Sequence, residues 1–335
     1  MGSLISDFIT PLPLVGLFLI VMVIFYFLSK GADIIVNEAV AVSTHLRIPT
    51  SVIGATIVSL GTTLPEVSVS VLAAMKGNYD LALGNAIGSV MVDTGFILGL
   101  TLLVSPIIFD YSAIRIESWI QFFTGLFIVV IAIPVASEAS IGVISKTTGM
   151  MMTVLLIVYL IWSFRNGMNK LEYYYDDYTE KYRTESLIKQ VFFLILGMGI
   201  VIISSDLLIT VVETIGLKLG VSQTFLATTL VAFGTSIPEL VTSIKAILKG
   251  HGDLAFGNII GADILNVLFV TGLAAVFAKN QLLVSEVFFN LHFPAMLFIL
   301  VAFRYFTLVN KHTLGRMEGG ILLGTYLVYL GLTGM

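Results

Sequence analysis

Long apolar stretches follow one another along almost the whole sequence of 335 residues. Most are at least about 20 residues long, the length of helix that crosses the hydrocarbon core of a bilayer. Hydrophobic residues make up 57% of the chain and charged residues only 11%, against roughly 25% charged residues in a soluble domain. The sequence therefore predicts an integral, all-α membrane protein, embedded in the lipid bilayer over nearly its whole length.

We expect ten transmembrane helices, at 11–37, 50–75, 80–105, 114–136, 143–165, 187–213, 222–248, 253–278, 285–308 and 317–334. No basic residue precedes Lys30, so the first apolar run is predicted to be a retained span. With the N-terminus outside, thirteen Lys and Arg residues lie at inner loops and helix ends and only four lie outside, namely Lys76, Lys146, Lys218 and Lys279. This bias predicts that both termini face outward from a plasma or inner membrane.

The sequence also repeats itself at an offset of 173 residues. Residues 50–93 and 223–266 align without a gap, and 17 of the 44 positions are identical. Five spans separate the two copies, so they would cross the membrane in opposite directions, as the repeats of secondary transporters do. We therefore expect two inverted five-helix repeats, 1–165 and 187–335, joined by a cytoplasmic loop at 166–186. The acids of that loop lack the spacing of a calcium-binding EF-hand.

Each copy carries a proline and a glutamate in the middle of a span. The first reads Gly-Thr-Thr-Leu-Pro-Glu at 61–66 and the second Gly-Thr-Ser-Ile-Pro-Glu at 234–239. Pro65 and Pro238 cannot donate a backbone hydrogen bond, so each helix should break at the midplane and free carbonyl groups there. Thr62 and Glu66 are four residues apart, so we expect each threonine hydroxyl to share a helix face with its own glutamate.

Buried carboxylates are the main functional signal. Glu66 and Glu239 lie near the bilayer centre, where a charged side chain costs about 3 kcal/mol, and Asp93 adds a third. No Lys or Arg lies near the centre of the second, third, seventh or eighth span, so a bound cation or a proton must offset these charges. Hydroxyl, carboxylate and carbonyl oxygens suit calcium or sodium better than zinc or copper.

The third and eighth spans add glycines and a polar stripe. The paired glycines, four residues apart, allow close helix packing. The stripe repeats every four residues and is expected to complete an oxygen-lined cavity, although its asparagines could merely bond neighbouring helices. Its members are Asn85, Ser89 and Asp93 in one copy and Asn258, Ala262 and Asn266 in the other.

These paired motifs, each followed by Gly-Asn-x-Ile-Gly, resemble the α-repeats of the sodium/calcium exchangers, within the cation/calcium exchanger superfamily. The resemblance covers essentially the whole chain. It implies a calcium site formed by Glu66, Glu239, Thr62 and Thr235. It also implies flanking sodium sites that use the side chains of Thr63, Ser236 and Ser89 and the carbonyls of Ser59 and Ala232, with Asp93 and Asn266 at the last polar position of each repeat.

The sequence departs from that family in three places. Ala262 replaces a usual serine, Val90 and Asp263 replace a usual asparagine, and the acid at the last polar position is in the first repeat, as Asp93, whereas many relatives have it in the second. These changes bear on sodium stoichiometry and ion selectivity. They also make potassium dependence unexpected.

We therefore expect an antiporter that exchanges Na⁺ for Ca²⁺ by alternating access, acting as a monomer without a cofactor or nucleic-acid partner. The main alternative is an exchanger of Ca²⁺ for H⁺ through the same carboxylates, and a passive cation channel is another. An intramembrane protease is disfavoured because only Asp93 is expected to be a deep aspartate and no His-Glu-x-x-His motif occurs. Asp33 and Asp206, which match each other, are interpreted as structural, and the four histidines lie outside the motifs.

Overall fold

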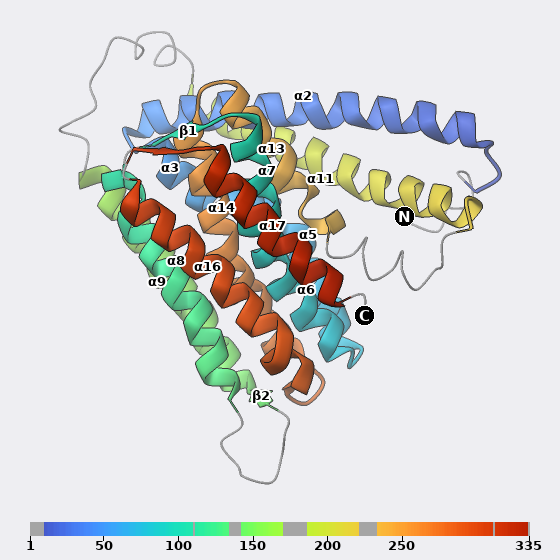
Figure 1. The fold of residues 1–335 in the computed structure, drawn as a ribbon. Coiled ribbons are helices and arrows are strands. Elements are labelled where there is room, and N and C mark those ends of the chain that lie inside the picture. The colour runs from blue at the N-terminus through green and yellow to red at the C-terminus, as the bar shows by residue number, and fades with distance from the viewer. Residues whose placement is uncertain are drawn as a thin grey trace.

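The computed structural model describes residues 10–109, 111–133, 142–169, 186–220, 233–310 and 312–333. Within this part the chain is almost wholly helical (Figure 1). Seven helices are long and apolar enough to cross a membrane, or eight if the bent pair Thr50–Thr62 and Leu64–Met75 is counted as one span. The predicted all-helical membrane fold is therefore confirmed.

The described elements, with η denoting π-helix, are α2 (Leu14–Leu46), α3 (Thr50–Ile53), η1 (Gly54–Val58), α4 (Ser59–Thr62), α5 (Leu64–Met75), α6 (Tyr79–Met91), η2 (Val92–Ile97), α7 (Leu98–Val104), β1 (Ile107–Ile108), α8 (Tyr111–Ala132), β2 (Gly142–Ile144), α9 (Lys146–Asn169), α11 (Leu187–Lys218), α13 (Ile237–Leu248), α14 (Gly252–Leu265), η5 (Asn266–Thr271), α15 (Gly272–Phe277), β3 (Leu282–Val284), η6 (Phe288–His292), α16 (Phe293–Val309), β4 (Thr313–Leu314) and α17 (Arg316–Thr333). The short strands pair antiparallel, β1 with β4 and β2 with β3.

The two longest helices, α2 and α11, run side by side in opposite directions (Figure 1). They approach closely where Gly31 meets Gly197, since a methyl group on either glycine would lie within 3.2 Å of the other glycine's carbonyl oxygen. The predicted end of the first span at residue 37 is wrong, because Ala39, Ala41 and Val42 are buried and the helix continues to Leu46. It ends at Arg47, whose left-handed φ of 56° closes the last turn.

The second predicted span is broken where the proline requires it. Pro65 stands at the start of α5, and the two parts of the span meet at 46°. In the second copy a helical turn ends at Ser236, and α13 begins at Ile237 with Pro238 in its first turn. The part of that span before Phe233 lies outside the described residues.

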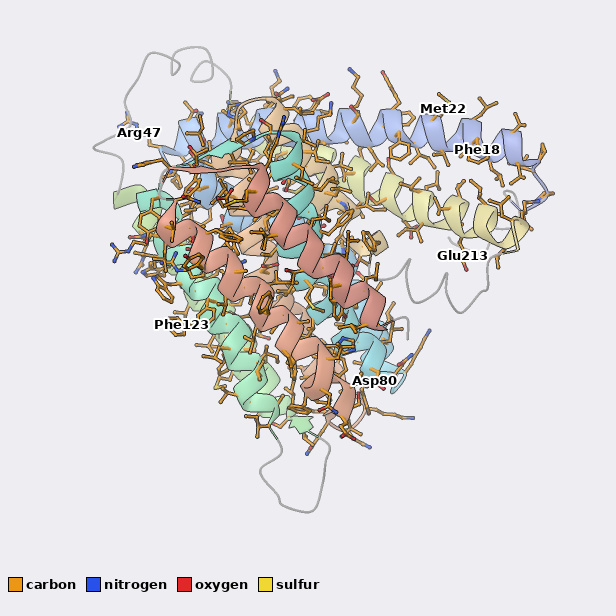
Figure 2. All side chains as sticks on the ribbon, in the orientation of Figure 1. Phe18, Met22, Arg47, Asp80, Phe123 and Glu213 are labelled. Carbon is orange, nitrogen blue, oxygen red and sulfur yellow. The ribbon has the colours of Figure 1, made fainter. Side chains whose placement is uncertain are left out.

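Helix α14 lies at the centre of the bundle, and its residues from Leu254 to Leu265 are all buried. Gly257 and Gly261 allow it to touch the backbone of α3 and η1 at Ser51 and Ala55, as the glycine spacing predicts. The outer helices carry exposed apolar side chains such as Phe18, Met22 and Phe123 (Figure 2). In a membrane protein such a surface faces lipid.

Replacing Gly257 with alanine should destabilise the fold. The added methyl group would collide with the Ser51 backbone carbonyl, which cannot move without displacing α3. Overpacking of this kind costs about 1–3 kcal/mol, which thermal unfolding in detergent would detect. The control is Gly320→Ala in α17, where a methyl group meets nothing within 4 Å. Equal unfolding temperatures for the two variants would contradict this packing.

Candidate functional site

The two glutamates of the repeated motif lie at the breaks in their helices. Glu66 is in the first turn of α5 and Glu239 in the first turn of α13, and their exposed fractions are 0% and 1%. Thr63 Oγ1 is 3.4 Å from Glu239 Oε1, and Ser236 Oγ is 3.4 Å from Glu66 Oε1. Each carboxylate therefore accepts a hydrogen bond from the motif of the other copy.

The threonines of the motif follow the same crossed pattern. Thr62 interacts with Glu239, and Thr235 with Glu66. The expectation that each hydroxyl shares a helix face with its own glutamate is therefore wrong. The break at Thr63 interrupts the helical turn, so residues four apart no longer follow one regular helix. The two broken helices instead place each hydroxyl against the opposite copy.

Two asparagines hold this arrangement together. Asn85 of α6 donates to the backbone carbonyl of Glu66 at 3.2 Å and to Ser70 Oγ at 2.9 Å. It also accepts a bond from Thr235 at 3.2 Å. Asn85 thus bonds neighbouring helices and satisfies one backbone group near the break.

Asn258 of α14 has the equivalent role in the other copy. It accepts from Thr62 Oγ1 at 3.4 Å and donates to Ser243 Oγ at 3.3 Å. Each side-chain bond described so far has an equivalent bond in the other copy, with both partners shifted by 173 residues. The bond from Asn85 to the Glu66 carbonyl is the exception. The hydrogen-bond network of the site therefore has the twofold character of the sequence repeat.

Several oxygen atoms of the site are buried but have no hydrogen-bond partner. They are Glu66 Oε2, Glu239 Oε2, Asp93 Oδ1, Asn266 Oδ1 and Ser89 Oγ. Asn266 donates to the other oxygen of Asp93 at 3.3 Å, which links the two copies again. Buried polar atoms without partners are rare in native proteins and call for an explanation, such as a role in binding an ion. Carboxylate, amide and hydroxyl oxygens suit calcium and sodium.

The charge balance around these acids is strongly negative. Arg304 of α16 is the one buried Lys or Arg side chain in the described part of the chain, and it contacts Ser118, Thr307 and the Trp119 ring. No group of three His, Cys, Asp or Glu side chains is arranged to bind a metal in that part of the chain. A cation between the glutamates would therefore need hydroxyl, amide or carbonyl ligands beside the carboxylates.

A further deep carboxylate, Asp263, escaped the sequence prediction. It lies in α14 with an exposed fraction of 2%, so the expectation that only Asp93 is a deep aspartate is wrong. The comparison of repeats gave no signal because its counterpart, Val90, is apolar. The position itself, an acid within an apolar span, was the signal available.

Of the two predicted carbonyl ligands, Ser59 and Ala232, only Ser59 lies within the described residues. The Ser59 carbonyl already accepts bonds from the Thr63 backbone at 2.9 Å and from Thr62 Oγ1 at 3.3 Å. Ala232 lies outside the described residues, as does most of the predicted connecting loop, from 170 to 185.

The other singled-out residues lie away from the glutamates' contacts. Asp33 forms ion pairs with Lys245 and Lys249, in keeping with a structural role. His292 is 2.8 Å from the Tyr329 hydroxyl and packs among rings. Burial, with the nearby Lys249, lowers the pKa of His251 in the loop before α14.

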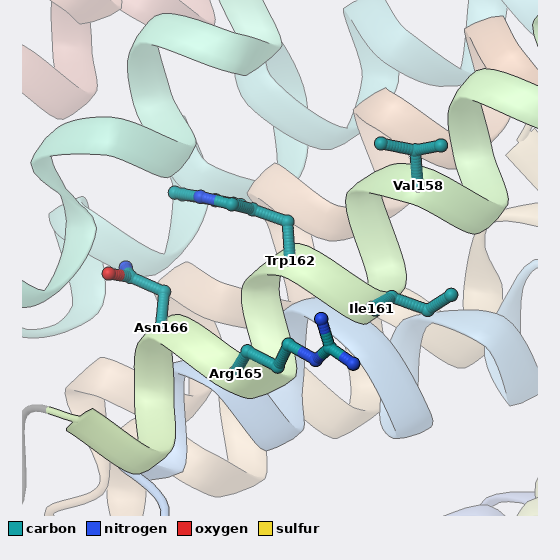
Figure 3. A pocket seen from close by; sticks show the side chains of 5 residues that line it. All are labelled: Val158, Ile161, Trp162, Arg165 and Asn166. Atoms are coloured by element: carbon teal, nitrogen blue, oxygen red, sulfur yellow. The ribbon is translucent and has the colours of Figure 1, made fainter.

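A pocket beside α9 is separate from the predicted ligands. Figure 3 shows the side chains that line it, which are Val158, Ile161, Trp162, Arg165 and Asn166. All five lie within about two turns of the single helix α9, and none belongs to the repeated motif. It adds nothing to the candidate ion site.

Comparison with known proteins covers both halves of the chain. The family model described as sodium/calcium exchanger protein matches residues 16–165 and 189–335. The chain is 28% identical to the uncharacterized membrane protein MJ0091 of Methanocaldococcus jannaschii, over 94% of this chain and 96% of that protein. It is 27% identical to the sodium/calcium exchanger MaX1 of Methanosarcina acetivorans, over 93% and 97%. The inner membrane protein YrbG of Escherichia coli is 29% identical over 96% of each chain.

Solved structures of the sodium-calcium exchanger NCX_Mj have a similar fold. The form soaked with zero Na⁺ and Ca²⁺ has a TM-score of 0.79 and 27% identity, over 95% of this chain and 98% of that one. The form soaked with 2.5 mM Na⁺ and 1 mM Sr²⁺ has the same TM-score and 25% identity, over 95% and 99%. With its two crossed glutamates and a family model that matches both halves, this chain belongs to the sodium/calcium exchanger family.

Proposed function

We propose that this chain is a secondary active antiporter that exchanges sodium for calcium by alternating access. The observation that carries the proposal is the pair of buried glutamates, each bonded by the opposite copy and each left with an oxygen that has no partner. No basic side chain is bonded to either, in the part of the chain described. The relatives named as sodium/calcium exchangers, MaX1 and NCX_Mj, support the same activity.

The proposed topology has ten spans in two inverted repeats. The spans additional to the eight found by length and hydropathy are α17 and the broken helix that ends in α13. We place the repeats at 1–165 and 187–335, the connecting loop 166–186 in the cytoplasm, and both termini outside the plasma or inner membrane. The protein would act as a monomer and, as a transporter, not as an enzyme. The antiparallel pair of α2 and α11 and the twofold bonds of the site support the inversion.

In the proposed site, calcium lies between Glu66 and Glu239, with Thr62 and Thr235 as hydroxyl ligands. Sodium would use the remaining polar groups: Thr63, Ser236, Ser89, Asp93, Asn266 and the Ser59 and Ala232 carbonyls. Because Thr62, Thr63, Thr235 and Ser236 contact the opposite glutamates, calcium and sodium would compete for the same oxygens. That competition is what an exchanger requires.

The number of sodium ions decides how steep a calcium gradient can be held. A tenfold sodium gradient supplies about 1.4 kcal/mol per ion, and one net charge moved across 100 mV adds about 2.3 kcal/mol. Three-for-one exchange therefore yields about 6.5 kcal/mol and two-for-one about 2.8 kcal/mol. Only the first holds a calcium gradient of about 10⁴-fold.

Calcium uptake by the purified protein in proteoliposomes should depend on an opposing sodium gradient. We expect ⁴⁵Ca²⁺ uptake into sodium-loaded vesicles to stop when sodium is equal on both sides, and to continue when the pH gradient is removed. Protein-free vesicles are the control. Uptake that followed the pH gradient and ignored sodium would establish the alternative, a calcium/proton exchanger, and uptake that needed no counter-ion would indicate a channel.

Replacing either central glutamate with glutamine should abolish calcium binding. Glu66→Gln or Glu239→Gln removes one of the two charges that face the ion but keeps the size of the side chain. Removing one partner from a buried charged cluster typically costs 3–5 kcal/mol, or a loss of affinity above about 100-fold, which isothermal titration calorimetry measures. Glu213→Gln on α11 (Figure 2), a glutamate outside both repeated motifs, is the matched control. Wild-type affinity in either site variant would count decisively against the site.

A cluster of ion pairs at one end of the bundle offers a way to follow alternating access. Asp33 of α2 pairs with Lys249 at 2.9 Å and with Lys245 at 3.4 Å, and Lys249 also bonds Asn37 at 2.9 Å. These contacts attach the long helix α2 to α13, which carries Glu239. The positive-inside bias of the sequence supports a cytoplasmic location for this end of the bundle.

The repeat offset maps Asp33 onto Asp206 and Lys249 onto Lys76. Both mapped residues are exposed and form no ion pair with any described residue. In a transporter of two inverted repeats, the opposite-facing state exchanges the conformations of the repeats. The ion pair of Asp33 with Lys249 would then open while Asp206 meets Lys76 at the other side.

Cysteine cross-linking tests this exchange of ion pairs, and the chain has no native cysteine to interfere. Because an aspartate–lysine pair is wider than a disulfide tolerates, a short, reducible bifunctional thiol reagent is needed. We expect cross-links in both Asp33→Cys/Lys249→Cys and Asp206→Cys/Lys76→Cys, each stopping transport until reduced, with the site reachable from opposite sides. Asp33→Cys/Lys76→Cys is the control. Failure of the second pair to cross-link during transport would refute the exchange.

A further inference from the structure

Asp263 has a set of contacts that the central site does not explain. Its Oδ2 atom accepts a bond from Thr94 Oγ1 of η2 and another from Gln121 Nε2 of α8, each at 2.5 Å. Gln121 also donates to Thr94 Oγ1 at 3.1 Å. All three side chains are at least 98% buried. The other carboxylate oxygen, Oδ1, is buried without a partner.

These contacts favour an ionised aspartate. Both donors bond the same oxygen, and hydrogen bonds donated to a carboxylate stabilise its charged form, whereas burial without a compensating charge opposes it. A charged carboxylate within the membrane needs a compensating cation. Arg304, the one buried basic side chain in the described residues, is engaged with Ser118, Thr307 and Trp119 instead.

The electrostatic balance of the whole site leads to the same requirement. Asp93 interacts electrostatically with Glu66, Glu239 and Asp263, so the four acids belong to one charged region. A calcium ion would offset two of their charges. The other two remain, and the described residues provide no basic side chain bonded to them.

Two neighbouring contacts connect η2 with the end of α14 and the start of η5. In one, Thr94 bonds Asp263, and in the next, Asn266 bonds Asp93. Each contact leaves acceptor oxygens without donors, namely Asp263 Oδ1, Asp93 Oδ1 and Asn266 Oδ1. Carboxylate and amide oxygens are ligands for hard cations. Asp263 also directly follows Ala262, where the repeat loses a hydroxyl that Ser89 provides in the other copy.

We propose that Asp263, oriented by Thr94 and Gln121, forms a sodium site beside the central one, which adds a coupling ion to the exchange cycle. The site exists in one repeat only, since Val90 occupies the mirrored position. It rests on the proposed sodium/calcium exchange and specifies its stoichiometry. In it, Gln121 and Thr94 are positioning residues, and Asp263 supplies the charge.

The test is the coupling ratio of Asp263→Asn in proteoliposomes. The ratio follows from the sodium gradient that just balances a fixed calcium gradient at a set membrane potential. We expect the variant to move one sodium ion fewer per calcium than the wild type. Calcium affinity in calorimetry should fall far less than in Glu66→Gln or Glu239→Gln, because both central glutamates are intact. Asp80→Asn, the same change at an exposed residue of α6 (Figure 2), is the matched control.

An unchanged ratio in Asp263→Asn would overturn the proposal, and so would a ratio that changes only with the pH gradient, since the bound ion would then be a proton. A wild-type protein that ignores sodium would refute the exchange itself, which is a different result. If Asp263→Asn does not fold, Thr94→Val replaces it. That variant should shift half-maximal sodium activation to higher concentration, and an unchanged sodium dependence would again overturn the proposal.

Discussion

The structure depends on burying acidic side chains in a membrane bundle without basic partners. Glu66, Glu239, Asp93 and Asp263 have exposed fractions of 2% or less. Left ionised and uncompensated, each would cost several kcal/mol, so the bundle is stable only if ions or protons enter it. The broken helices and the asparagine bonds position these carboxylates, and in the proposed function calcium or sodium supplies the missing charge. Ion binding and the stability of the bundle are therefore coupled.

Much of this arrangement was predictable because its causes are local in the sequence. Pro65 cannot donate to the preceding turn, so the helix breaks, and Gly257 has no side chain, so α14 can touch α3. The crossed bonds of Thr62 and Thr63 were not predictable in this way. Helical spacing relates residues within one element, whereas these partners are 176 or more positions away.

Asp263 was missed for a different reason. The search for function relied on what the two copies share, and a residue present in one copy has no match to mark it. The end of the first span was misplaced for another reason, because Asn37 and Glu38 interrupt the apolar run there. The side chains after that point are buried, so packing of α2 within the bundle carries the helix on to Leu46.

Three of the polar differences between the copies lie close together in the third and eighth predicted spans. Identical residues, such as Asn85 and Asn258, form the twofold scaffold. The changes from Ser89 to Ala262, Val90 to Asp263 and Asp93 to Asn266 all fall within five residues. A symmetric scaffold allows two equivalent conformations, which alternating access requires. The asymmetric residues within it would make the proposed ion sites unequal, so that calcium and sodium need not occupy them in the same way. The ion pairs of Asp33 are partly exposed and worth at most about 1 kcal/mol each. That is small beside the roughly 6 kcal/mol of a three-sodium gradient, so these pairs can bias the two conformations while the bound ions decide which one is populated.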